Sequence, residues 1–103
     1  MAEGFVEYAL DQLAQMGEVR AKAMFGGHGI YHGETFFAIV HDGRLYLKVD
    51  DATRGAFEEA GMGPFRPYGK QTMASYYEVP GDVLEDEEEL VIWARRAVDV
   101  ARS

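Results

Sequence analysis

Apolar residues near the N-terminus recur at helical spacing. Val6, Ala9 and Leu13 fall on one side of a helix, while polar residues occupy the other side. Gly17 then provides a natural helix end. The pattern predicts an amphipathic helix over residues 4–16.

A period of two begins at Arg20 and predicts the first strand, over residues 20–25. The run Gly26-Gly27-His28-Gly29 interrupts this strand, and glycine clusters favour bulges and bends. We therefore expect a bulge or a sharp bend before Ile30-Tyr31.

The next two runs predict a hairpin. Residues 35–41 are apolar on both faces, as in a central strand, and residues 44–49 alternate regularly. Asp42-Gly43 lies between them and favours a two-residue hairpin turn, because both positions of that turn need a positive φ.

The second half of the chain continues the alternation of helices and strands. It predicts a short helix capped by Asp50 or Asp51 and ending near Ala60, strands at 64–68 and 72–79 around Gly69-Lys70 with Pro67 on an edge, and a helix from Asp82 or Asp86 to about Ala101. The order α-β-β-β-α-β-β-α predicts a single α+β domain, with helices packed on an antiparallel sheet.

Composition narrows the functional classes. With 103 residues, 48% hydrophobic and 27% charged, the chain is typical of one globular domain. The absence of cysteine excludes disulfides, thiolate catalysis and zinc-finger sites. The N-terminus has no basic, apolar leader and no apolar run reaches membrane-spanning length, so we expect a cytoplasmic protein without membrane contact.

The formal net charge of −8 disfavours nucleic-acid binding, whose affinity comes largely from neutralising phosphates. Six of the 18 acidic residues lie between positions 82 and 89, however. Outside that stretch the acidic and basic residues nearly balance, so a local basic patch is compatible with the sequence.

A basic face is the main candidate for a binding surface. If the first strand and the strand at 44–49 share a sheet face, Arg20, Lys22, Arg44 and Lys48 lie together with Tyr46 between them. Cations beside an aromatic ring suit an anionic partner or ligand. The alternative is an ordinary solvated face whose cations pair with some of the acidic residues.

Other chemistry has weak support in the sequence. His28, His32 and His41 are the only good nitrogen ligands, and we do not expect them to converge on a metal. The glycine run fits no nucleotide-binding pattern, and Ser75 has no nucleophile motif around it. We therefore expect no catalytic residues, no metal and no cofactor.

The final helix and the strand before it raise three further questions. The acidic run Glu85–Glu89 complements the helix dipole, with a docking surface for a basic partner as the alternative. Ile92 points to the polar side of the helix, either alone or as part of a dimer or partner contact. Tyr76 and Tyr77 face opposite sides of their strand, so we expect one in the core and the other on a surface.

Three motifs in this order resemble the N-terminal domain of the TfoX/Sxy family of bacterial competence regulators. They are residues 20–31, which contain Met24-Phe25-Gly26-Gly27, then Asp42-Gly43-Arg44-Leu45-Tyr46-Leu47-Lys48, then residues 73–80, which contain Tyr76-Tyr77-Glu78-Val79-Pro80. The resemblance implies a fold similar to type III secretion chaperones. Longer family members carry a C-terminal domain of helix-hairpin-helix character, and we expect this chain to be a stand-alone form without it.

The resemblance also implies a non-enzymatic role in transcriptional regulation, as a coactivator beside a catabolite-activator-type DNA-binding protein. The expected partner is another protein, and a homodimer is left open. The alternatives are direct nucleic-acid binding through the basic face, and a small-molecule-binding module. We expect the other motif residues mainly to fix the fold: Met24, Phe25, Gly26, Gly27, Tyr76, Tyr77 and Pro80.

Overall fold

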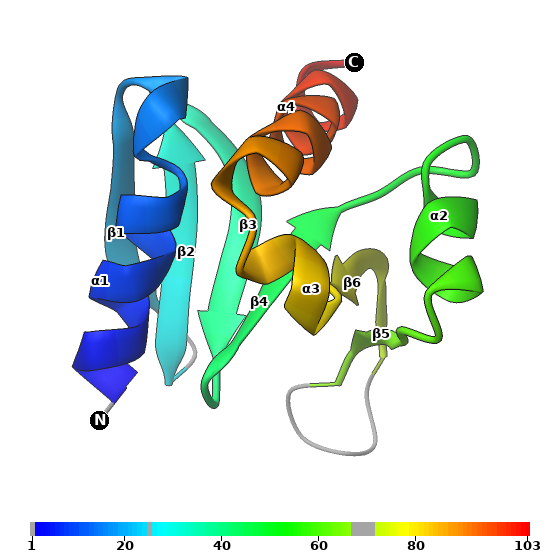
Figure 1. The fold of residues 1–103 in the computed structure, drawn as a ribbon, viewed down its shortest axis with the longest axis horizontal. Coiled ribbons are helices and arrows are strands. Elements are labelled where there is room, and N and C mark those ends of the chain that lie inside the picture. The colour runs from blue at the N-terminus through cyan, green and yellow to red at the C-terminus, as the bar shows by residue number, and fades with distance from the viewer. Residues whose placement is uncertain (1, 25, 67–71) are drawn as a thin grey trace.

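A single antiparallel sheet with helices on one face forms the architecture (Figure 1). The computed structural model describes residues 2–24, 26–66 and 72–103. Its elements are α1 (Ala2–Gln12), the 3₁₀ turn η1 (Ala14–Met16), β1 (Val19–Met24), β2 (Gly27–His32), β3 (Thr35–His41), β4 (Arg44–Lys48), α2 (Arg54–Glu59), β5 (Pro64–Phe65), β6 (Met73–Glu78), α3 (Gly81–Leu84) and α4 (Glu87–Arg102). The predicted α+β class is confirmed.

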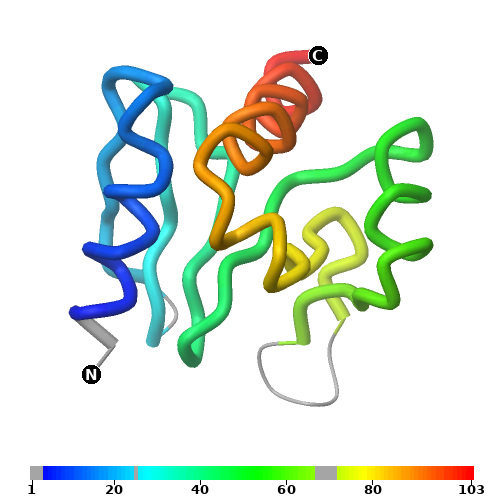
Figure 2. The backbone as a smooth tube through the Cα atoms, viewed as in Figure 1, coloured from blue at the N-terminus to red at the C-terminus, as the bar shows by residue number. Residues whose placement is uncertain are grey.

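The six strands follow the order β1-β2-β3-β4-β6-β5, and every neighbouring pair is antiparallel. β1 and β5 are therefore the edge strands. Helix α1 packs beside the β1–β2 hairpin, and α4 crosses β3 and β4 (Figure 2). The predicted edge position of Pro67 and the turn at Gly69-Lys70 lie outside the described residues, as does Phe25.

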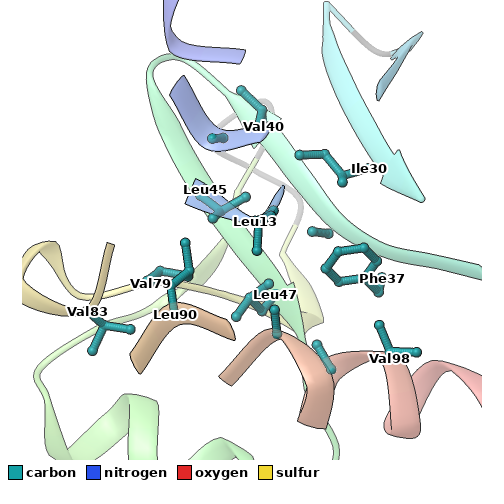
Figure 3. Close-up of a cluster of buried hydrophobic side chains, with 14 of the residues drawn as sticks. Leu13, Ile30, Phe37, Val40, Leu45, Leu47, Val79, Val83, Leu90 and Val98 are labelled. Atoms are coloured by element: carbon teal, nitrogen blue, oxygen red, sulfur yellow. The ribbon is translucent and has the colours of Figure 1, made fainter. Parts of the chain in front are cut away.

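The main core lies between the sheet and these helices (Figure 3). Phe37 and Leu47 from the sheet pack with Leu13, Leu90 and Val98 from the helical layer. All five side chains are buried. Burying them contributes about 1.5–3 kcal/mol for each large apolar side chain, which makes this layer the main source of stability.

A β-bulge in β3 explains why two successive residues face this core. The pairing of β2 with β3 matches Ile30 to Ala38 and Tyr31 to Phe36, which leaves Phe37 as the extra residue. A bulge lets neighbouring side chains point to the same side of a strand. Phe37 and Ala38 are both fully buried in the main core, whereas Phe36 faces the other side of the sheet.

Several local predictions are confirmed. Asp42 and Gly43 have φ values of 52° and 71°, as the two-residue hairpin turn requires. Asp86 caps α4 by accepting a hydrogen bond from the backbone N–H of Glu89. The predicted cap of the short helix by Asp50 or Asp51 was wrong, because the N-cap of α2 is Thr53 and no side chain caps it. The Asp50 carboxylate instead accepts hydrogen bonds from the backbone N–H groups of Ala52 and Thr53, 3.0 Å away in each case, in the turn before α2.

The prediction of a bulge or a sharp bend at the glycine run was wrong, because the chain reverses there between two strands. β1 and β2 are separate strands that pair antiparallel, from Val19 opposite His32 to Met24 opposite Gly27. Gly26 has a φ of 74°, which favours glycine and helps the chain reverse. The sheet therefore contains one strand more than predicted.

Helix boundaries also differ from the prediction. The first helix ends at Gln12 and continues as the 3₁₀ turn to Met16. The last helix is divided into α3 and α4, because Asp86 adopts an extended conformation between them. The acidic residues therefore lie in the first turns of two helices, Asp82 in α3 and Glu87–Glu89 in α4. α3 packs against α4.

Candidate recognition face

The face of the sheet opposite the helices carries the predicted basic residues, and we call it the open face. Directly paired residues share a face, so one row crosses the sheet from Lys22 through Gly29, Ile39 and Tyr46 to Glu78. A second buried cluster lies on this side and comes entirely from strand residues in the described part of the chain.

The predicted basic residues share this face but do not lie together. Arg20 and Lys22 are on β1, whereas Arg44, Tyr46 and Lys48 are on β4. β2 and β3 separate the two groups by three strand spacings, roughly 14 Å. The predicted adjacency was wrong because the glycine run forms a hairpin, which places β2 between the first strand and the rest of the sheet.

Aromatic rings bridge the gap between these two groups. The Arg20 guanidinium lies 4.8 Å from the centre of the Tyr31 ring, and the Lys48 ammonium lies 5.1 Å from the centre of the Tyr76 ring. The Phe36 ring lies between the two tyrosine rings. Its centre is 5.3 Å from that of Tyr31 and 5.7 Å from that of Tyr76. We call Tyr31, Phe36 and Tyr76 the aromatic row; a cation flanks each end of it.

Tyr46 does not provide the accessible ring that the sequence suggested. Its side chain is buried, and its ring lies 4.7 Å from that of Phe65. Burial raises the pKa of the Tyr46 phenol, and the nearby Glu78 carboxylate raises it further while Arg44 lowers it. Tyr46 is therefore a neutral part of the second cluster, and Tyr31 and Phe36 are the half-buried aromatic residues of this face.

The two adjacent tyrosines face opposite sides of β6, as predicted, but neither is on a surface. Tyr77 packs in the main core near Phe57, and Tyr76 packs in the second cluster. Both are at most 8% exposed. Burial, and then the neighbouring Tyr31, raise the pKa of Tyr76 to about 12, so its ring stays neutral at physiological pH. The surface prediction failed because the main core, with Phe57 of α2, covers one side of β6, and the strand side chains of the second cluster cover the other.

Arg44 pairs with an acidic residue, as the alternative of an ordinary solvated face predicts. Its guanidinium lies 3.4 Å from the Glu78 carboxylate, yet its side chain remains 58% exposed. The two residues line a groove of about 600 Å³ together with His41, Asp42 and Arg66. The arginines and carboxylates of this groove balance in charge, so it has no strong preference for an anion or a cation.

The histidines occupy different sides of the sheet. His32 donates a hydrogen bond from Nε2 to the carbonyl oxygen of Met16, 2.9 Å away, and so lies on the helical side. His28 pairs with Val40 on that side as well, whereas His41 pairs with Arg44 and contacts Phe65. Within the described part of the chain, no three His, Asp or Glu side chains gather into a metal-binding group.

Gly27 and Gly29, both in β2, occupy crowded positions. A Cβ atom on Gly27 would overlap the carbonyl oxygen of Val40. One on Gly29 would come within 2.6 Å of the Met24 side chain and 2.8 Å of Phe36. These contacts explain why small residues are needed where β2 passes its neighbours. In the third motif, Pro80 is buried and begins α3.

Two further predictions concern Ile92 and the membrane. Ile92 is 46% exposed, so the helical periodicity placed it correctly. Of the helices in the described ranges, none has the length and apolar character needed to span a membrane.

Comparison with known proteins supports the resemblance drawn from the motifs. The TfoX N-terminal domain matches residues 11–101. The DNA transformation protein TfoX1 of Aliivibrio fischeri is 34% identical over 67 residues, which cover 63% of this chain and 32% of that relative. The matched region thus spans about a third of that relative's length. Because the domain match extends over nearly the whole sequence, the chain belongs to the TfoX N-terminal domain family.

Proposed function

We propose that this chain is a non-enzymatic regulatory domain that contacts a protein linked to transcription through its open face. Membership of the TfoX N-terminal domain family supports a regulatory role, and one relative is named a DNA transformation protein. The observation that carries the proposal is the aromatic row, with Arg20 at one end and Lys48 at the other.

Such a surface suits a protein partner. Aromatic residues and arginine are enriched at protein interfaces, because they bury large areas and still offer polar contacts. The second cluster supports this face from below, which holds the rings in position before binding. An acidic segment on the partner would complement the cations at both ends, while its apolar side chains would cover Tyr31 and Phe36.

Direct nucleic-acid binding is the second candidate. The observation in its favour is that Arg20, Lys22, Arg44 and Lys48 all lie on one face of a chain whose total charge is −8. Four phosphate contacts would give a log–log salt dependence of about −3.6 on duplex DNA. The roughly 14 Å between the two cationic groups exceeds the axial rise of about 3.4 Å between successive phosphates of one strand, so the two groups would contact different phosphates.

Site-specific crosslinking in cells tests both candidates. We expect a photoreactive phenylalanine analogue at position 31 to form a discrete adduct with another protein. The same analogue in place of Tyr8 is the matched control, because Tyr8 is 38% exposed on α1 and lies away from the open face. It should form no such adduct.

The adduct identifies the class of partner. A protease-sensitive adduct that is lost in the Arg20→Glu, Lys22→Glu variant supports the proposal. A nuclease-sensitive adduct would replace it with the nucleic-acid candidate, and an adduct between two copies would make the face a dimer interface. Adducts at position 8 without adducts at position 31 would show that the partner binds near α1 and not at the open face.

A further inference from the structure

We propose that a groove between α2 and the α3–α4 segment binds a basic peptide segment of a partner protein, with one apolar side chain as its anchor. Figure 1 shows the backbone of these helices. This groove is lined by residues of α2, α3 and α4 and shares no residue with the open face. The inference therefore stands independently of the proposed function of that face.

The floor and one wall of the groove are apolar and come from three helices. Pro80 and Val83 are buried at the start of α3, and Trp93 of α4 is half-buried beside them. Ala56 of α2 and Ala60, the residue that follows this helix, form the wall, and their small side chains leave space above the floor. The resulting volume, about 540 Å³, has room for one large apolar side chain and the peptide around it.

The orientation of Trp93 is fixed without any ligand. Its ring meets that of Phe57 edge-on, with 4.8 Å between the ring centres and 76° between their planes. Its indole N–H donates a hydrogen bond to the Glu89 carboxylate, 3.2 Å away. A ring held from both sides gives a preorganised apolar surface, which reduces the entropy lost on binding.

The rim of the groove is acidic. Four carboxylates from α2, α3 and the start of α4 surround it: Glu59, Asp82, Asp86 and Glu89. No basic side chain of the described residues lines the groove. Across the described residues, the two ion pairs involve Glu78 and Asp51 instead. Four like charges around an apolar floor repel one another, so a bound cationic segment would relieve that repulsion.

The occupant follows from these two properties. An apolar side chain would pack on Trp93 and Val83, while lysine or arginine residues on either side of it would reach the rim. An acidic or neutral peptide would meet the same apolar floor but not the charge complementarity. The exposed Glu85, Glu87 and Glu88 extend the negative potential beyond the rim and would speed the encounter.

Trp93 makes the proposal directly measurable, because it is the single tryptophan of the chain. The probe is a short synthetic peptide with arginines on both sides of one leucine. We expect it to change the Trp93 fluorescence saturably, with an affinity that falls as salt rises. Replacing the leucine of the peptide by serine should abolish most of the change, since the anchor is lost.

Charge reversal on the rim provides the decisive comparison. Glu59→Lys with Asp82→Lys should weaken binding about tenfold or more, as expected when interfacial charges become repulsive. Glu7→Lys with Asp11→Lys makes the same change of net charge on α1, which packs by β1, and should alter the affinity by no more than about twofold. The milder pair Glu59→Gln and Asp82→Asn should give a smaller loss in the same direction.

Two outcomes would overturn the proposal. An unchanged Trp93 signal at saturating peptide would show that the floor is not occupied. An equal loss of affinity in the rim and α1 variants would show attraction by the net charge of the protein rather than by the groove.

Discussion

Replacing Gly27 with alanine is expected to lower the free energy of unfolding by about 3 kcal/mol or more. The new Cβ atom would overlap the carbonyl oxygen of Val40, a backbone atom of the neighbouring strand β3. Backbone in the middle of a sheet has little freedom to move, so β2 and β3 would have to separate. Urea unfolding followed by Trp93 fluorescence measures the loss.

Gly55→Ala is the matched control. Gly55 lies in α2, and a Cβ atom there would meet nothing within 4 Å. Alanine favours a helix more than glycine does, so this variant should be more stable by about 0.5–1 kcal/mol. A Gly27→Ala protein as stable as the wild type would contradict the close approach of β2 and β3.

The second large effect is expected at Phe37. Phe37→Ala should lower the free energy of unfolding by about 3–5 kcal/mol, because it removes a fully buried ring and leaves a cavity. The ring lies between the sheet and α4, in the region shown in Figure 3. The same urea measurement applies, and thermal unfolding provides a second readout.

Phe36→Ala is the control for Phe37→Ala, because it removes the same ring from the opposite face of the sheet. Phe36 is adjacent in sequence but lies half-buried on the open face, so its loss should cost clearly less stability. It should instead weaken the contact made by the aromatic row. Equal destabilisation by Phe36→Ala and Phe37→Ala would contradict the assignment of these neighbours to opposite faces.

The features that could be predicted from the sequence are those fixed by short-range chemistry. The Asp42-Gly43 turn is one, because its positive φ values restrict the residue types at both positions. The cap formed by Asp86 is another, since a carboxylate satisfies exposed N–H groups at a helix start. In each case the residues that determine the structure lie within a few positions of one another.

Strand β2 could not be predicted as a separate strand, because its sequence is poor in strand-forming residues at its start. Gly27 and Gly29 have low intrinsic preference for a strand, and they are used here for close packing against β3 and the side chains beside it. Pairing on both sides, with β1 and with β3, holds this segment extended. Such tertiary pairing overrides local preference.

The candidate surfaces show the same limit. Alternation along each strand placed Arg20, Lys22, Arg44 and Lys48 on one face, but their separation depends on the strand order. The aromatic row combines residues from β2, β3 and β6, and the acidic groove combines α2 with α3 and α4. No spacing within a single element contains that information.

The proposed regulatory role of this domain depends on the open face. Its most direct test compares Arg20→Glu with Lys22→Glu, on this face, and Arg95→Glu with Arg96→Glu, on the exposed side of α4. Both variants change the net charge equally, and thermal unfolding checks that both fold. The measurement is the frequency of DNA transformation in the host bacterium, the process for which the relative TfoX1 is named and in which we propose that this domain acts. We predict that the first variant falls to the level of a strain without the protein while the second remains at the wild-type level. Wild-type transformation by the first variant, or an equal loss in both, would contradict the account.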